Sequence, residues 1–500
     1  MKIKIAALIL ALLVLMAVAV GCVTSGDGGG TTTPKSGEVT PGTTPSGGSD
    51  DTTAEPAPTF VDANYNNDEF VVFQRNANAS SYPGFYIISD SVTDTMSEAT
   101  YNRNIAVEDK YSIKLTAMEV ADPYKEIRTY ITSGDVPFDV ILDRRTYMGS
   151  IAQEGYLYNF KNLEHIDMSR DWWDSNCADS YEVAGKLFFM ANDISVSNLA
   201  GARFFYFNKQ LITEYDLENP YDLVEKNQWT LDKFLTMVSA VSTDNGDGIW
   251  DGNDTYGLCV ETGSGNGNIM HLMVGCGIKF IDKTADSLTT DAYTEKTQNI
   301  MSSVASVLVG GSSVLTYEAA AAGADLSGHA NKYDYGRSLF AEDHFLFIQG
   351  NMAVSSQLKN MKSDYGVAPN PKYDPSQESY YHKMDRYSLI WAIPRCNMDY
   401  DRVGVIMEYW AYESSKTVMP AYYEITIKTK RVQEETASNM IDLIKNSIRY
   451  DLSEIYNSDI LSVLYNGYEG GNLSSTWASG KKVVGKALEK VYNALKDLDD

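Results

Sequence analysis

The chain has 500 residues and a formal net charge of -26 at pH 7, with 67 acidic side chains against 41 basic ones. A summed field of that sign repels polyanions, which argues against nucleic acid or an anionic membrane surface as a partner and suits a neutral or cationic ligand better. About 440 residues remain after the amino-terminal segment, too many for one hydrophobic core, so two lobes are the simplest division.

The first residues are typical of a secretion signal. A short basic region precedes an apolar run over residues 5–20, which is too short to span a bilayer comfortably, and small residues lead to Cys22. This order resembles the bacterial lipobox, in which the chain is cut before a cysteine that carries a diacylglycerol; Ala19 stands where Leu is usual. We therefore expect a signal peptide over residues 1–21 and a lipid on Cys22. The alternative is an ordinary signal peptide with an incidental cysteine.

Residues 22–59 predict a flexible linker. Gly, Ser, Thr, Pro and Asp dominate this segment, and it has almost no large apolar side chain. Such a composition cannot bury enough surface to offset the entropy of ordering the chain. We expect it to tether a folded body to the outer face of the cell membrane.

The cysteines of the body do not form a dense disulfide framework. They are Cys177, Cys259, Cys276 and Cys396. Buried free thiols are the simpler interpretation, and Cys259 with Cys276 is the pair close enough in sequence to suggest a bridge. No Cys-x-x-Cys or Cys/His cluster predicts a zinc site.

Short β-rich runs alternate with helical patterns at the start of the body. The runs over residues 69–73 and 111–115 predict strands, whereas residues 99–111 and 122–133 have helical spacing. The apolar run over residues 138–142 is typical of a strand buried on both faces. Repeated strand–helix–strand units predict an α/β fold with a parallel sheet.

Ligands of such sheets bind beyond the carboxyl ends of the strands. We therefore expect Asp139, Asp143 and Arg144 to lie where a ligand is met. Further along, residues 204–209 predict a strand, and Thr230 is placed to cap a helix over residues 231–242.

Several short motifs follow one another along the body. In the first half they are Pro137-Phe138-Asp139-Val140, Gly155-Tyr156-Leu157, Gly185-Lys186-Leu187, Phe207-Asn208-Lys209 and Trp229-Thr230-Leu231-Asp232-Lys233-Phe234. In the second half they are Phe347-Ile348-Gln349-Gly350-Asn351-Met352-Ala353, Tyr365-Gly366-Val367-Ala368-Pro369-Asn370-Pro371 and Trp391-Ala392-Ile393-Pro394. Their order, over residues 65–495, resembles that of the extracellular solute-binding proteins of sugar-type ABC importers, the maltose-binding-protein-like family. Val354 departs from the family pattern, which has Met there.

The resemblance implies a bilobal, periplasmic-binding-protein-like fold of type II, with two α/β lobes joined by a hinge. The lobes are expected to divide the chain as follows: lobe 1 at residues 60–190 and 370–415, lobe 2 at residues 195–365 and 416–500. It also implies a monomer that captures a small solute, an oligosaccharide above all, by lobe closure and delivers it to ABC permease subunits.

Sugar-binding clefts stack pyranose rings on flat aromatic side chains and bind hydroxyls through planar polar groups. The chain has 34 Tyr and 7 Trp, which supply such surfaces. We expect ligand contacts from the residues Trp172, Trp173, Asp174, Trp391, Tyr387, Arg386 and Asp139. The resemblance supports the Trp-Trp-Asp run, where one indole is expected in the core and the other at the cleft. For Asp139 the favoured alternative is the structural acid of the family's Pro-x-Asp-Val strand, and solvent-facing loop positions are the alternative for Arg386 and Tyr387.

Two loops are rich in glycine. Residues 263–268 lack the Lys-Ser/Thr of a phosphate-binding loop, so a flexible loop is the better interpretation. Residues 243–254 match a twelve-residue calcium loop, although Thr243 replaces the first Asp and the last ligand is Asp rather than Glu. The expected oxygen donors are Asn245, Asp247, the Ile249 carbonyl, Asp251 and Asp254. The role of calcium there would be structural, with a plain surface turn as the alternative, and no other cofactor is expected.

Catalysis has little support in the sequence. The five histidines occur singly, and no nucleophile elbow, His-Glu-x-x-His or Walker motif is present. We expect no enzyme activity. A lipid-anchored glycoside hydrolase is the main alternative, since paired carboxylates are set by the fold and not by spacing. A surface adhesion protein is a third, against which the absence of internal repeats counts. Within the binding class, a peptide or polyamine ligand stays open.

Overall fold

The computed structural model describes residues 58–76, 87–89, 91–263, 265, 267–309, 312–396, 398–428, 435–456 and 459–499. The expected signal peptide, Cys22 and nearly all of the expected linker lie outside these residues, as do Ser264 and Asn266. Within the described part, Thr59–Asp500 packs as one unit. None of the described helices combines the length and the apolar character needed to cross a bilayer.

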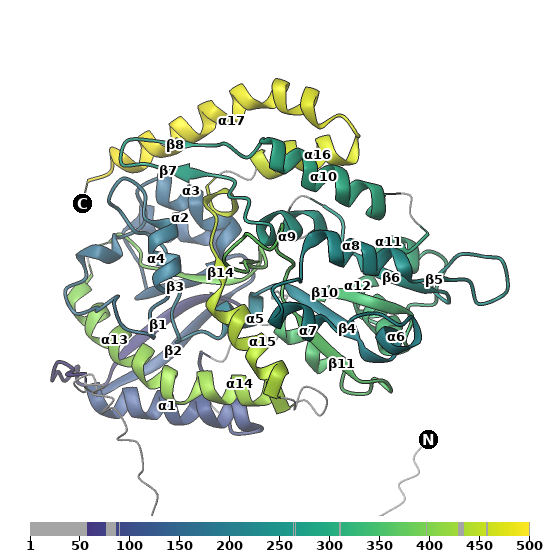
Figure 1. The fold of residues 1–500 in the computed structure, drawn as a ribbon. Coiled ribbons are helices and arrows are strands. Elements are labelled where there is room, and N and C mark those ends of the chain that lie inside the picture. Colours follow the sequence, from purple (N-terminus) through teal and green to yellow (C-terminus); the bar gives the residue numbers. More distant parts are fainter. Residues whose placement is uncertain are drawn as a thin grey trace, which may run out of the picture. The chain divides into compact units, whose positions relative to one another are not determined.

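The first sheet has four strands in the order β13-β3-β1-β2 (Figure 1). β1 (Asp68–Arg75) pairs in parallel with β2 (Ile113–Val120) and β3 (Val140–Arg144), and β13 (Leu389–Ala392) runs antiparallel to β3. Apolar side chains of these strands are buried, as the runs predict. The expected strands near residues 69–73, 111–115 and 138–142 are therefore confirmed, with ends shifted by a few residues.

Four helices accompany this sheet. They are α1 (Thr95–Tyr111), α2 (Pro123–Ser133), α3 (Arg145–Gln153) and α13 (Tyr400–Lys416). Asp94 begins α1 with a capping box, because its carboxylate accepts the Ser97 N–H while the Ser97 hydroxyl accepts the Asp94 N–H. α1 and α13 lie side by side (Figure 1). The helices expected over residues 99–111 and 122–133 are confirmed.

The second sheet is mixed and has six strands in the order β11-β4-β10-β6-β5, with β9 paired to β6. The strands are β4 (Phe204–Asn208), β5 (Ser242–Thr243), β6 (Thr255–Val260), β9 (Val314–Thr316), β10 (Phe345–Gly350) and β11 (Tyr365–Ala368). β6 is parallel to β9 and β10, whereas β4 runs antiparallel to β10 and β11. The Thr230 hydroxyl accepts the Lys233 N–H at the start of α8 (Leu231–Ala240), which confirms the expected cap.

The remaining elements complete the described unit. The other helices are α4 (Ser175–Tyr181), α5 (Ser197–Gly201), α6 (Lys209–Glu214), α7 (Pro220–Glu225), α9 (Asn268–Gly275), α10 (Glu295–Leu308), α11 (Tyr317–Ala320), α12 (Lys332–Ala341), α14 (Val418–Lys428), α15 (Glu435–Asn446), α16 (Asp459–Glu469) and α17 (Leu473–Lys496). Single 3-10 turns are η2 (Phe160–Asn162), η3 (Met352–Ser356) and η4 (Leu452–Glu454). The short strands β7 (Asp282–Lys283) and β8 (Leu288–Thr289) pair with each other, and β12 (His382–Lys383) pairs with β14 (Ile448–Arg449).

Two segments that connect the sheets run side by side. The first leads from the first sheet into β4 and the second leads from β11 back to β13. They are joined by backbone hydrogen bonds from Arg203 N–H to the Lys383 carbonyl (3.1 Å) and from Asp385 N–H to the Gly201 carbonyl (2.8 Å). β14 adds a third segment next to the second one. The architecture is α/β, as expected, while the lobe boundaries stay a prediction.

The four cysteines of the body are free thiols. Cys177, Cys259 and Cys276 are buried and Cys396 is partly exposed. Burial raises the pKa of the buried thiols, so they stay protonated at neutral pH. The simpler interpretation, buried free thiols, holds for the first three, and Cys259 and Cys276 form no bridge.

Candidate ligand-binding site

The carboxyl ends of the parallel strands meet at one edge of the first sheet. β1 ends at Arg75 and β3 ends at Arg144. Because β13 is antiparallel and begins with Leu389 opposite Arg144, the segment just before β13 reaches the same edge. This edge is where ligands bind in parallel α/β sheets.

Two arginines surround one tyrosine at this edge. The guanidinium carbon of Arg144 lies 4.9 Å from the ring centre of Tyr387, and that of Arg386 lies 5.3 Å from it. The Arg386 carbonyl accepts a hydrogen bond of 2.5 Å from the Thr146 hydroxyl at the start of α3. All four residues are half-buried. The structure therefore brings the expected Arg386 and Tyr387 together with Arg144, which the strand pattern placed at this edge.

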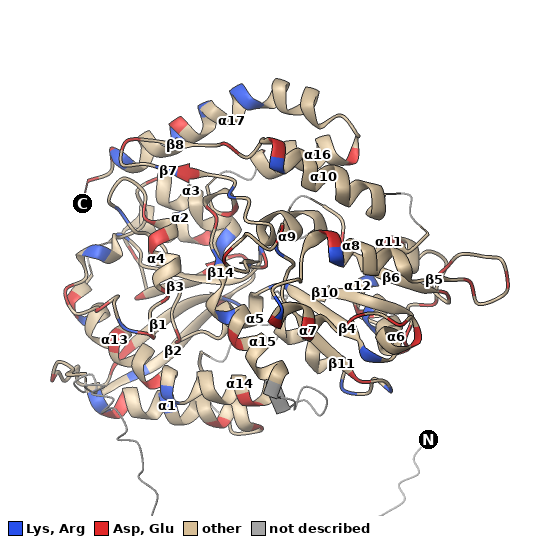
Figure 2. Cartoon of the chain, viewed as in Figure 1, with Lys and Arg blue, Asp and Glu red and all other residues tan. Residues whose placement is uncertain are grey.

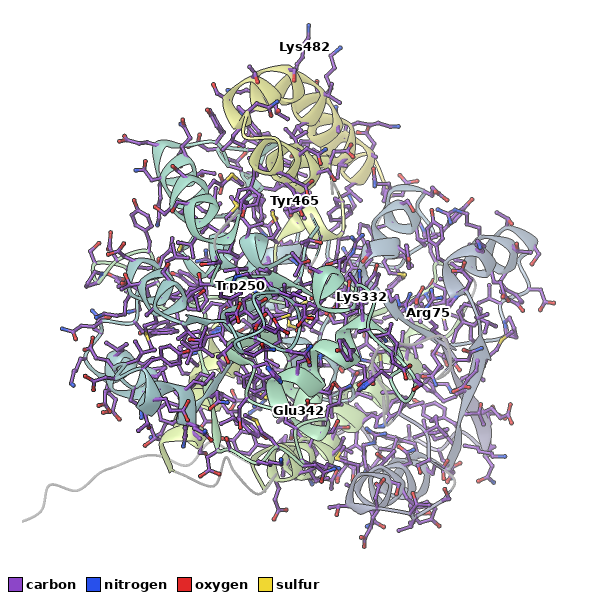
Figure 3. All side chains as sticks on the ribbon, turned by 90° about the vertical axis from the view of Figure 1, so that its right-hand side faces the viewer. Arg75, Trp250, Lys332, Glu342, Tyr465 and Lys482 are labelled. Carbon is purple, nitrogen blue, oxygen red and sulfur yellow. The ribbon has the colours of Figure 1, made fainter. Side chains whose placement is uncertain are left out.

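A second group of aromatic and basic side chains lies along the same edge. The Arg75 guanidinium is 5.7 Å from the ring centre of Tyr147, whose ring is 5.4 Å from that of Tyr124. Arg75 also pairs with buried Asp143 at 3.1 Å, and its place in the molecule is labelled in Figure 3. Arg75, Tyr147 and Tyr124 were not expected from the sequence. The signal that could have found them is position, because each ends a strand or begins the helix that follows one.

Arg203 lies at the corresponding edge of the second sheet, where it directly precedes β4. Its Nη1 lies 2.8 Å from Glu261, which follows β6, and its Nη2 lies 2.6 Å from Asp385. Asp385 belongs to the segment that leads into β13. Arg203 therefore links the edges of the two sheets through two largely buried ion pairs, one to the residue that follows β6 and one to the segment that leads into β13.

Arg386 packs against the Gly-rich loop that follows β6. A Cβ atom on Gly265 would lie only 2.5 Å from Nη1 of Arg386, so the absence of a side chain lets the guanidinium approach. Between these parts lies a cavity of about 200 Å³. Its lining residues are Thr146, Gly265, Lys383, Arg386, Glu454, Leu461 and Ser462.

Buried charges support the floor of this cavity. Glu454 forms ion pairs with Arg145, at 2.7 Å, and with Lys383, and all three side chains are at most 2% exposed. Burial lowers the pKa of Lys383, while the Glu454 carboxylate opposes that shift. Removing one partner from such a group would leave an uncompensated buried charge, which is costly. The three side chains therefore hold one another in place at the floor of the cavity.

Both indoles of the Trp172-Trp173 pair are buried. The Nε1 of Trp172 donates to Oε1 of Glu408 (3.1 Å), and the Nε1 of Trp173 donates to Oε2 of the same carboxylate (2.7 Å). Both indole N–H groups thus share one acceptor on α13, and the expected division between core and cleft stays a prediction. Burial raises the pKa of Glu408, and the indole hydrogen bonds oppose this. A direct ligand contact by either ring stays a prediction.

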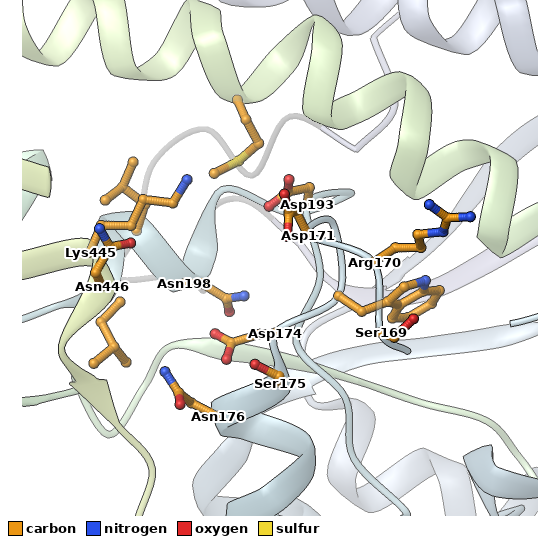
Figure 4. A pocket seen from close by; sticks show the side chains of 14 residues that line it. Ser169, Arg170, Asp171, Asp174, Ser175, Asn176, Asp193, Asn198, Lys445 and Asn446 are labelled. Atoms are coloured by element: carbon orange, nitrogen blue, oxygen red, sulfur yellow. The ribbon is translucent and has the colours of Figure 1, made fainter. Parts of the chain in front are cut away.

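Trp173 and Asp174 nevertheless line a second cavity, of about 230 Å³. Figure 4 shows Asp174 on one side of it and Lys445 with Asn446 on the other. The Asp174 carboxylate accepts the Cys177 N–H (3.0 Å) at the start of α4 and the Tyr450 hydroxyl (2.6 Å). Asp174 is thus held by structural partners at the rim of this cavity.

Two expected contacts lie away from the sheet edge. Trp391 is 1% exposed and packs against Trp410, with ring centres 6.0 Å apart. Asp139 accepts the Val71 N–H (2.7 Å) and pairs with Arg402 (3.0 Å) at the amino end of β3. Five residues of strand span about 16 Å. The expectation that Asp139 meets a ligand beside Arg144 is corrected, because the two lie at opposite ends of β3.

The expected calcium loop is closed by its own side chains. The Asp254 carboxylate accepts the N–H groups of Asn245 (2.9 Å) and Asp251 (2.8 Å). The side-chain oxygens of Asn245 and Asp247 accept N–H groups two residues further on, of Asp247 and Ile249 respectively. Carboxylates have further lone pairs, so these oxygens still fit a hard cation. Among the described Asp, Glu, His and Cys side chains, three ligand atoms converge only at Glu164, His165 and Asp401.

Comparison with known proteins addresses the fold. No protein-family model matches the chain, and no curated protein matches it either. Solved structures do match. The cyclic α-maltosyl-1,6-maltose binding protein of Arthrobacter globiformis is 13% identical, with a TM-score of 0.55 over 86% of this chain and 100% of that one. A cyclo/maltodextrin-binding protein complexed with maltotetraose is 13% identical, with a TM-score of 0.52 over 86% and 97%.

An ABC substrate-binding protein of Listeria monocytogenes, solved with cycloalternan, is 12% identical, with a TM-score of 0.51 over 86% of this chain and 98% of that one. Identities this low relate the chains by fold alone, and the fold extends over nearly all of each known protein. The chain therefore has the periplasmic-binding-protein-like α/β fold of ABC-transporter solute-binding proteins, as the order of its motifs implies.

Proposed function

We propose that this chain is the solute-binding component of an ABC transporter and that it captures a small solute, an oligosaccharide, without chemical conversion. The observation that carries the proposal is the meeting of the two sheet edges. Half-buried Tyr387 and Tyr147 lie there with Arg144 and Arg386, next to a cavity. Tyrosine rings offer flat apolar faces to the C–H groups of a sugar, and guanidinium groups donate to its hydroxyls.

The proposed mechanism is lobe closure. The two sheets are connected by paired segments, and Arg203 bridges Glu261 and Asp385 across them. A ligand that touches both edges binds a closed arrangement better than an open one and so shifts the population toward closure. The closed form then docks on the permease. Differential binding between the two states supplies the energy, with no covalent step.

The proposal includes attachment through a lipid on Cys22 at the outer face of the cell membrane, and delivery to permease subunits. The sequence patterns of the first 59 residues support the attachment. Metabolic labelling with a radioactive fatty acid tests it, because a Cys22→Ser variant would then carry no label. Label on that variant would contradict it.

We also propose a structural calcium ion in the loop that contains Asp247 and Asp254. Bound calcium would stabilise the folded state by mass action. Thermal melting with 2 mM EDTA and with excess calcium tests this, with Asp247→Asn as the variant. Equal melting temperatures in both conditions would contradict calcium binding. The loop would then be the plain surface turn that Asp254 already closes.

A thermal-shift screen of the full-length protein tests the main proposal. The panel holds neutral and acidic mono- and oligosaccharides, short peptides and polyamines. We expect a saccharide to raise the melting temperature, since a ligand at 100 times its Kd stabilises by about 2.7 kcal/mol. If a peptide or a polyamine raised the melting temperature instead, the ligand would belong to that class and not to the saccharides. Release of reducing ends from a polysaccharide would favour the alternative function, a glycoside hydrolase.

A further inference from the structure

We infer that a groove between α10 and the turn from α16 to α17 is a second binding site, which takes a neutral polysaccharide chain. The three helices lie together in Figure 1. The groove shares no lining residue with the cavity beside Arg386, so this site goes beyond the proposed function. Its volume is about 490 Å³, which lies within the range of ligand-binding pockets, whereas the cavity beside Arg386 has about 200 Å³.

Two half-buried tyrosine rings line the groove. Tyr293, just before α10, stacks on Trp477 of α17, with ring centres 5.7 Å apart and an angle of 22° between the ring planes. Tyr468 lies near the end of α16, and its ring centre is 6.2 Å from that of Tyr465. Rings that are held by other rings present flat apolar surfaces, on which the C–H groups of a pyranose can stack.

Four exposed polar side chains line the same groove, namely Gln298, Asn299, Ser302 and Ser474. The Gln298 amide donates to the Thr294 carbonyl at 3.3 Å. Within the described part of the chain, no hydrogen bond engages the side chains of Asn299, Ser302 and Ser474. Amides and hydroxyls both donate and accept hydrogen bonds, as the hydroxyls of a sugar do. The groove therefore combines the two kinds of surface that a carbohydrate needs.

None of the described residues that line the groove is charged. The charged residues of α10 are Glu295 and Lys296 in its first turn, and the rest of that helix is uncharged (Figure 2). Glu469, which follows Tyr468, accepts the Tyr465 hydroxyl at 3.2 Å and is not part of the lining. A charged ligand would gain no ion pair from the lining, so the groove suits a neutral one.

The turn between α16 and α17 fixes one wall of the groove. A Cβ atom on Gly467 would lie 2.8 Å from the Cα of Leu473, so the start of α17 packs directly against the end of α16. Gly471 has a φ of 62°, a left-handed conformation that glycine adopts without strain. This close packing of backbone sets the places of Tyr468 and Ser474.

The helix α16 contributes to both sites. Leu461 and Ser462, near its start, line the cavity beside Arg386, whereas Gly467 and Tyr468, near its end, line the groove. Seven residues of α-helix span about 10 Å. A polymer that is held in the groove therefore stays close to the cavity, which raises the effective concentration of a saccharide end presented there.

Affinity electrophoresis of the full-length protein tests the inference. Native gels contain increasing amounts of glycogen, mixed-linkage β-glucan, arabinoxylan or galactomannan, with polygalacturonate as an acidic polymer. We expect at least one neutral polymer to retard the protein in proportion to its concentration, which gives a Kd, and polygalacturonate to retard it less.

Variants locate the binding. Ser302→Arg places a long side chain in the groove, and its matched control is Ser303→Arg at the next exposed position of α10, which does not line the groove. Tyr468→Ala removes a ring, and its control is Tyr101→Ala at an exposed tyrosine of α1. We expect each groove variant to weaken polymer binding at least tenfold and each control to change it less than twofold. Circular dichroism and melting verify that each variant is folded, and the exposed position of Ser302 keeps the test valid if Tyr468→Ala unfolds.

The outcomes separate this inference from the proposed function. If no neutral polymer retards the protein, if polygalacturonate retards it more than any of them, or if Ser302→Arg binds as tightly as Ser303→Arg, the groove is not a site for a neutral polysaccharide. The thermal shift caused by a small saccharide at the cavity should be the same in Ser302→Arg and in the parent. A shift that is lost in Ser302→Arg would mean that the groove is not a separate site.

Discussion

Two groups of aromatic side chains in this protein use their rings in opposite ways. Trp172 and Trp173 are buried, and both indole N–H groups donate to Glu408 on α13. Tyr147 and Tyr387 are half-buried at the edge of the first sheet, and each has an arginine next to its ring. The indole N–H groups of the first group are satisfied inside the protein, whereas the rings of the second group are half-buried where β1 and β3 end.

The difference shows that residue type does not assign an aromatic group to ligand binding. Tryptophan is the larger stacking surface, but a buried indole needs an acceptor, and the acceptor decides where its ring lies. A position directly after a parallel strand is the better guide, since strand ends remain accessible while strand interiors pack. The comparison predicts that the tryptophans act on stability and the tyrosines on affinity.

The largest effect is expected from Glu408→Ala. It leaves two buried indole donors without their acceptor, and each such loss costs about 1–3 kcal/mol, so the free energy of unfolding should fall by about 3 kcal/mol. Urea denaturation measures this. Glu408→Gln is the matched control, because it keeps an acceptor oxygen and should lose less. If Glu408→Ala unfolds at the same urea concentration as the parent, the tryptophan pair is not held as described.

The contribution of the buried His382 to the free energy of unfolding is expected to change with pH by about 2 kcal/mol. Burial lowers its pKa to about 3, and its ring accepts the Asn370 N–H at 3.0 Å. In the unfolded chain the pKa of histidine is about 6.5. Between these values the unfolded state binds the extra proton, so the contribution of His382 is complete above pH 6.5 and falls as the pH drops toward 3.

From pH 7 to pH 5 this contribution should fall by about 2 kcal/mol. The measurement is the difference in unfolding free energy between the parent and His382→Gln at both values, which cancels the titration of other groups. The variant should lose less stability on acidification than the parent. His165→Gln, at a partly exposed histidine, serves as the control. Parallel pH profiles of the parent and His382→Gln would contradict a neutral buried ring.

Tyr387→Ala tests the role of the half-buried tyrosines at the edge of the first sheet. We expect the affinity for the stabilising saccharide to fall about tenfold, or about 1.4 kcal/mol, with little change in melting temperature, because the ring is only half-buried. Tyr387→Phe keeps the ring and should keep most of the affinity. Trp172→Phe should show the reverse pattern, with lower stability and unchanged affinity. Equal affinity losses in Trp172→Phe and Tyr387→Ala would break the distinction between the groups.

The smallest effect is expected from Gly265→Ala. The added methyl group displaces the flexible Arg386 side chain rather than backbone, so the melting temperature should hardly change. The guanidinium moves from its place beside Tyr387, and the affinity for the stabilising saccharide should fall about threefold, by roughly 0.7 kcal/mol. Calorimetry with that saccharide measures it. An unchanged affinity would contradict a contribution of Arg386 to the site.

The sequence by itself determined the local structure of this protein. Strands β1 and β3, helices α1 and α2, and the Thr230 cap follow from periodicity and capping, which depend on residues a few positions apart. The order of the motifs implied the α/β fold, and the strand pattern placed Arg144 at the sheet edge. Arg386 and Tyr387 were expected from their types and from the segment they occupy.

Only the tertiary structure decided which side chains meet. Arg203 and Asp385 are 182 residues apart, and Trp173 finds its acceptor 235 residues away. No local pattern encodes such pairs, because they depend on how the segments between the sheets are joined. Burial is settled at the same level, which is why Trp172 and Trp173 are buried while Tyr147 and Tyr387, near the ends of the strands, are only half-buried. The physical reason is that contact and solvation are properties of the packed chain, whereas propensity is a property of short segments.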